Sequence, residues 1–261
     1  MKEIKYPHVD LPLRWFAGSE EDVEREEGDD APGTPTKLSF DDRSVRAGFV
    51  RKVFTLVTLM FAIVAAFSTV PIISKGFKDW CQEYWWLVYV AMVVFFVFYF
   101  ALICCAGVRR SFPCNLIILT IFTLSAAVMT MFVTATYQLE TVLIALLITT
   151  GCSASVILFA ATTKRDLTSC LGIAFLLGVC LILFGLMATI FSLIFNWNFL
   201  HIVYSGLAAL LTMFYLAIDI QLIMGGRRIE ISPEEYIFAA THIFVDILTL
   251  FFSILGVVGR N

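Results

Sequence analysis

Seven apolar segments, each about as long as a bilayer is thick, constrain this chain more than any other feature. A transmembrane helix needs roughly 20 apolar residues, and its backbone groups must find partners within the segment itself. A membrane β-barrel would show alternation over segments of about ten residues instead. The sequence therefore predicts an all-α membrane protein, a bundle of seven transmembrane helices. The predicted spans are 50–73, 85–107, 114–136, 139–161, 168–195, 201–224 and 234–257.

The composition supports this class and divides the chain in two. The chain is 60% hydrophobic and 15% charged, whereas soluble domains are roughly 45–50% apolar and about 25% charged. Of its 21 acidic residues, 12 lie in the first 42 positions, together with prolines and glycines. We therefore expect residues 1–42 to be a disordered acidic tail and residues 43–261 to form the transmembrane domain. No early apolar run precedes the first span, so we expect that span to serve as an uncleaved insertion signal.

Basic residues in the short joints predict the orientation, because cytosolic loops carry the excess of Lys and Arg. With seven spans, the N-terminal flank and every second joint hold ten of these residues, against three on the other side. The tail and N-terminus are therefore predicted to be cytosolic. The seventh span either crosses completely or re-enters, because it carries an acid.

Several functional classes lack support in the sequence. There is no basic groove with interleaved aromatic residues, so nucleic acid is not an expected partner. The seven cysteines have no zinc-ligand spacing, and nucleophile and phosphate-binding motifs are absent, so we expect no cofactor and no enzyme activity. Cys104, Cys105 and Cys114 lie near a basic loop and are either packed thiols or acylation sites.

The last two spans form a hairpin with clear boundaries. Gly225-Gly226 is typical of a helix end, and Ser232-Pro233-Glu234-Glu235 reads as a capping box with proline at the first helical position.

Two aspartates lie inside these spans, Asp219 in the sixth and Asp246 in the seventh. A charged group there costs roughly 2.5–3.5 kcal/mol on insertion scales, which makes both functional candidates. Both fall on the order of 10–20 Å inward from the same connection. If the carboxyl groups meet, they would share a proton and titrate as a pair, and their oxygens would suit Ca²⁺. Alternatively, each bonds a hydroxyl on a neighbouring helix.

Three further features have two readings each. His242 lies four residues before Asp246 on the same helix face and is either a structural hydrogen-bonding residue or a titrating partner. Glu140 begins the fourth span and is either a solvated helix-terminal acid or an ion-entry ligand near the lumenal surface. The segment Thr149-Thr150-Gly151-Cys152-Ser153 either permits close helix packing or lines a polar path.

Residues 43–258 resemble the transmembrane Bax-inhibitor-motif family, in particular its Lifeguard branch. The most specific piece is the last hairpin, AIDIQLIMGGRRIEISPEEYIFAATHIFVDILTLFFSILGVVG, supported by SVRAGFVRKVFTLVTLMF, RRSFPCNLIILTIFTL and TTKRDLT. The resemblance implies a seven-helix bundle of the Bax-inhibitor type whose pH-sensitive di-aspartyl site closes a Ca²⁺ path. Asp219 and Asp246 match that site, and Arg109 or Arg110 matches a basic residue that engages the acids.

The resemblance also implies a Ca²⁺ leak in endoplasmic reticulum or Golgi membranes, with the plasma membrane as a further location, that lowers stored Ca²⁺ and suppresses apoptosis. The competing hypothesis is an adaptor without transport activity that binds Bcl-2-type or death-receptor proteins. The chain departs from the family pattern beside the first acid. Ile218 and Ile220 replace the usual tyrosine and threonine, and His242 replaces a more usual asparagine or serine.

Overall fold

A computed structural model describes residues 36–195, 199–227, 229 and 231–259 of the chain. Within them, seven helices are long and apolar enough to cross a membrane, which confirms the predicted class and number of spans. The elements are α2 (Thr36–Ile73), α3 (Lys75–Glu83), α4 (Leu87–Cys104), α5 (Ala106–Arg110), α6 (Cys114–Ala135), α7 (Leu139–Thr162), the 3₁₀ turn η1 (Thr168–Cys170), α8 (Leu171–Phe195), α9 (Phe199–Met224), the 3₁₀ turn η2 (Pro233–Glu235) and α10 (Tyr236–Val258).

The predicted tail falls almost entirely outside the described residues, so its disorder stays a prediction. Helix α2 begins at Thr36, well before the first predicted span, and includes the last residues assigned to the tail. Helix α10 is unbroken over 23 residues, or ~35 Å at 1.5 Å per residue, which is enough to cross the bilayer.

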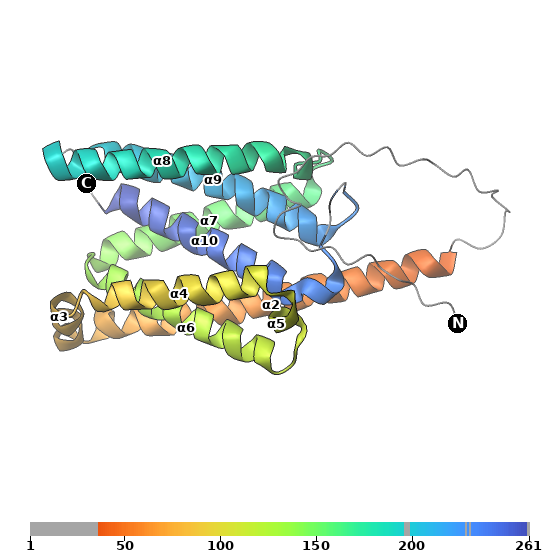
Figure 1. The fold of residues 1–261 in the computed structure, drawn as a ribbon, viewed down its shortest axis with the longest axis horizontal. Coiled ribbons are helices and arrows are strands. Elements are labelled where there is room, and N and C mark those ends of the chain that lie inside the picture. Colours follow the sequence, from red (N-terminus) through yellow and green to blue (C-terminus); the bar gives the residue numbers. More distant parts are fainter. Residues whose placement is uncertain (1–35, 196–198, 228, 230, 260–261) are drawn as a thin grey trace.

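Helix α10 occupies the centre of the bundle. It packs against α9 and α7 on one side and against α2, α4 and α6 on the other (Figure 1). In each of α6, α9 and α10, 50% of the apolar 18-residue stretch that could span a membrane is buried inside the protein. In α8 the corresponding share is 6%. Polar groups on α10 are therefore shielded by protein on several sides, whereas α8 presents its surface to lipid.

One end of the bundle, which we call the basic end, holds the C-terminal ends of α4, α7 and α9 and the start of α10. There, three arginines donate hydrogen bonds to carbonyls at these helix ends. Arg109 donates to Leu102 O and Ile103 O of α4. Arg46 donates to Ile223 O of α9, and Arg227 to Thr163 O just beyond α7. Cations are favourable at helix C-termini, so the residues that predict the cytosolic side also stabilise helix ends.

The joint between α9 and α10 begins as predicted and then departs from the capping box. Gly225 and Gly226 both have φ of 71°, the left-handed conformation in which glycine ends a helix. The Ser232 side chain, however, makes no capping hydrogen bond. Glu235 cannot complete the box because its carboxylate is bound elsewhere.

Most of the described hydroxyl bonds in α7 stay within the helix. Thr149, Thr150 and Ser155 each donate to the carbonyl four residues earlier. The buried Ser153 hydroxyl, however, has no hydrogen-bond partner among the described residues. The threonine bonds favour close packing for their part of the small and hydroxylic segment, and Ser153 leaves the polar-path alternative open.

Candidate functional site

The two intramembrane aspartates come together between α9 and α10, the pair of helices with the most extensive contact in the fold. Asp219 lies in the last two turns of α9, and Asp246 lies near the middle of α10. The Asp246 carboxyl group lies within electrostatic and hydrogen-bonding range of Asp219. A hydrogen bond between two carboxyl groups requires a proton on one of them, because an ionised carboxylate only accepts. The arrangement is thus one of two acids sharing a site, not two separate hydroxyl-bound acids.

His242 adds a third ionisable group beside Asp219. Its Nδ1 lies 3.5 Å from Asp219 Oδ2, and its ring lies 4.4 Å from that of Phe238. Among the described residues, His242 Nε2 and Asp246 Oδ2 are buried without a hydrogen-bond partner. Three ionisable groups therefore meet, with unused hydrogen-bonding capacity on two of them.

The walls of the site include residues that the sequence did not single out. Tyr99 of α4 and Tyr215 of α9 both lie within electrostatic range of the two aspartates. The Tyr215 hydroxyl donates to Ala174 O at 2.7 Å. Ile218 and Ile220, which replace the usual polar neighbours of the first acid, are 1% exposed and belong to the apolar core. The two residues next to Asp219 in the sequence are therefore buried apolar side chains rather than hydroxyl-bearing ones.

Arg109 and Arg110 do not contact the aspartates in this structure; both pair with Glu235 at the start of α10. Arg109 Nε lies 2.8 Å from Glu235 Oε2, and Arg110 donates to Glu235 Oε1 through Nε at 2.9 Å and Nη2 at 2.6 Å. Arg109 and Glu235 are buried, whereas the Arg110 side chain is 52% exposed. The expectation that one of these arginines engages the acids needs correction for this conformation, because a nearer carboxylate competes successfully for both.

Glu235 is the charged partner that the sequence analysis missed. Its position after Pro233 suggested a local capping role, and its true partners lie 125 and 126 residues away in the chain. The available signal was the coincidence of a basic pair and an acidic pair at joints on the same predicted side of the membrane.

Glu140 lies apart from this region. It is exposed in the first turn of α7, and the start of this helix lies at the opposite end of the bundle from α5 (Figure 1). An acid is favourable there because of the helix dipole, and a role in ion entry stays a prediction.

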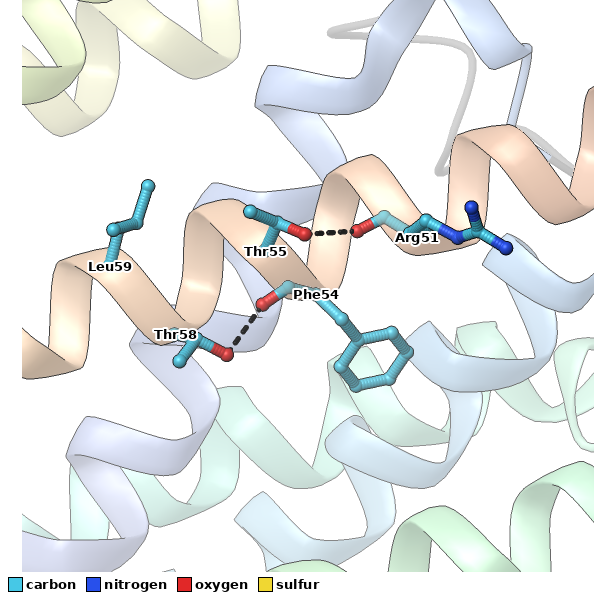
Figure 2. Close-up of a pocket in the computed structure, with 5 residues that line it drawn as sticks. All are labelled: Arg51, Phe54, Thr55, Thr58 and Leu59. Carbon is cyan, nitrogen blue, oxygen red and sulfur yellow. Dashed lines mark hydrogen bonds between the residues drawn. The ribbon is translucent and has the colours of Figure 1, made fainter.

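The described residues contain no cluster of three or more His, Cys, Asp and Glu side chains able to hold a metal ion. A Ca²⁺ ion prefers six to eight oxygen ligands, more than the carboxyl pair alone provides. A shallow groove elsewhere, on the outer face of α2, is lined by Arg51, Phe54, Thr55, Thr58 and Leu59 (Figure 2). Its two threonine hydroxyls donate to backbone carbonyls of their own helix, so they offer little to a ligand.

Comparison with known proteins identifies the class. Residues 46–261 match the family described as "Inhibitor of apoptosis-promoting Bax1", and the chain belongs to this family of multi-pass membrane proteins. Its members are membrane regulators rather than known enzymes, and membership implies a role in regulating apoptosis.

Within this family, the chain is similar to the Lifeguard proteins, as its last hairpin indicated. It is 38% identical to mouse Protein lifeguard 3 over 96% of the chain and 80% of that protein. It is 36% identical to the human Protein lifeguard 3 over 98% and 81%, and 27% identical to mouse Protein lifeguard 4 over 81% and 84%.

Proposed function

We propose that this protein is a proton-gated Ca²⁺ leak channel of intracellular membranes, which lowers stored Ca²⁺ and thereby restrains apoptosis. The observation that carries the proposal is the close pairing of the Asp219 and Asp246 carboxyl groups inside the bundle. Family membership supports the apoptotic role, and the apolar spans support a membrane location. Endoplasmic reticulum or Golgi is the expected location, with the N-terminus in the cytosol.

The gate follows from the charge state of the pair. With one proton, the two acids share a hydrogen bond and hold α9 against α10. When both are ionised in a poorly solvated setting, they repel unless a cation arrives between them. Proton loss therefore weakens the closed arrangement and creates a cation site at the same time, which couples pH to Ca²⁺ passage.

Ca²⁺ flux through purified protein in liposomes tests this proposal. Asp219→Asn and Asp246→Asn should each change the flux by about tenfold or more, since each removes an ionisable oxygen ligand and breaks the shared proton. Glu83→Gln is the control, because it neutralises an exposed acid of α3 outside the pair. Flux that is the same in wild type and both aspartate variants would rule out the di-aspartyl gate.

The family description, which names an inhibitor of Bax1, favours a second candidate, an adaptor for Bcl-2-type or death-receptor proteins. Because α2 begins at Thr36, deletion of residues 1–35 removes most of the acidic tail without cutting this helix. A tail-dependent adaptor loses protection against apoptosis in cells after this deletion, whereas a leak channel retains it.

A further inference from the structure

The cluster of Glu235, Arg109 and Arg110, which we call the basic-end cluster, joins segments that are distant in the chain. Arg109 contributes three contacts: it caps α4, pairs with Glu235, and places its guanidinium 4.8 Å above the Phe238 ring of α10. Breaking the ion pair would therefore loosen the start of α10 from the end of α4.

A continuous chain of contacts leads from this cluster to the aspartates. The Arg109 guanidinium covers the Phe238 ring, Phe238 packs on His242, and His242 contacts Asp219. Phe238, His242 and Asp246 follow one another at intervals of four residues, which places them on one face of α10. Glu235 ends the η2 turn directly before this helix. The face of α10 that carries the gate thus begins at the basic-end cluster.

The electrostatics of the cluster oppose a cation on this face. Two arginines and one glutamate give the cluster a net positive charge, and Arg109 is only 4% exposed. A Ca²⁺ ion that leaves the aspartates toward the basic end meets this buried guanidinium. Passage along this face therefore requires the cluster to rearrange.

We propose that Glu235 is a positioning residue that locks the basic end of the cation route, by holding Arg109 and Arg110 across the face of α10 that leads to Asp219 and Asp246. The lock rests on the proposed leak function and adds a second barrier, formed by opposite charges rather than by a shared proton. Opening then needs two events: ionisation of the aspartates and release of the start of α10.

Ca²⁺ flux per folded protein in liposomes tests the lock, with the monodisperse fraction as the measure of folding. Glu235→Gln should raise the flux by about tenfold, the change expected when a charge-assisted contact no longer favours the closed state. Glu235→Asp retains the carboxylate and should stay near wild type. Arg227→Gln is the control, because Arg227 caps a helix at the same end without contacting Glu235.

A third variant separates a lock from simple charge compensation. The combined change Arg109→Gln, Arg110→Gln and Glu235→Gln leaves no buried charge unpaired and guards against misfolding of the single variant. A lock predicts raised flux here too. If this combined variant returns to wild-type flux, Glu235 merely neutralises the arginines and the lock is wrong.

The remaining outcomes distinguish the lock from the gate. Unchanged flux in all Glu235 variants, together with altered flux in the aspartate variants, overturns the lock and leaves the proposed function intact. A wild-type protein that passes no Ca²⁺ overturns both.

Discussion

Two clusters of three ionisable groups lie along α10, and they balance charge in opposite ways. At the basic end, Glu235 is held by two permanent cations in ion pairs of 2.8 and 2.6 Å. Deeper in the bundle, Asp219 and Asp246 face each other, and the nearest basic group is a histidine at 3.5 Å. At the basic end the carboxylate faces two permanent cations, whereas the deeper cluster has no permanent cation and changes its charge only by gaining or losing protons.

This difference gives the two clusters different expected roles: the basic-end cluster holds helices together, and the aspartate cluster responds to pH. A buried Arg–Glu pair persists over the physiological pH range because arginine stays protonated. Removing either partner leaves the other as an unpaired buried charge, which is strongly destabilising. A carboxyl pair beside a histidine has no permanent cation, so its net charge depends on the protons it binds. We therefore expect substitutions at the basic end to affect stability most, and substitutions at the aspartates to affect pH dependence most.

The largest effect on stability is expected from Glu235→Gln. This change leaves the buried Arg109 without its carboxylate and should lower the free energy of unfolding by about 3–5 kcal/mol, as for other broken buried pairs. Thermal unfolding in detergent measures the loss. The combined neutral variant of Glu235, Arg109 and Arg110 should recover most of it, and a loss equal to that of the single variant would contradict this explanation.

A smaller effect on stability is expected from His242→Asn, which restores a residue more usual in the family. The imidazole contacts Asp219 through one nitrogen and is partly exposed, so the free energy of unfolding should fall by only about 1 kcal/mol. The pH dependence of Ca²⁺ flux should change, because one of the three ionisable groups of the cluster is gone. A pH profile superimposable on that of wild type would remove His242 from the sensing cluster.

The smallest effect is expected from Arg110→Gln. Its side chain is 52% exposed and Arg109 remains to pair with Glu235, so the cost should be no more than about 1 kcal/mol, as for a surface ion pair. Chemical denaturation of this variant beside Glu235→Gln measures the contrast. Equal losses of unfolding free energy in the two variants would show that the exposed Arg110 provides most of the stabilisation in the basic-end cluster.

Much of the fold could be predicted because a bilayer fixes the length and the apolar character of each spanning helix, and both can be read along the sequence. The seven spans, their short joints and the end of α9 at Gly225 follow from hydrophobic length and backbone conformation. The meeting of Asp219 and Asp246 could also be anticipated, since both lie at similar depth on adjacent antiparallel helices.

The partners of the arginines could not be predicted in the same way. Arg109 and Arg110 had several acids within reach on the same predicted side, and only the packing of α4, α5 and α10 decides which acid lies nearest. The same is true of Tyr99 and Tyr215, which are ordinary apolar-face residues in the sequence and become neighbours of the aspartates through helix rotation.

The proton-sharing gate is tested by the pH dependence of Ca²⁺ flux through the wild-type protein and Asp246→Asn, reconstituted in parallel. Wild-type flux should rise as the pH increases and the shared proton is lost, and the variant should lack this dependence. The same pH dependence in both proteins would mean that the gate does not depend on a proton shared by Asp219 and Asp246.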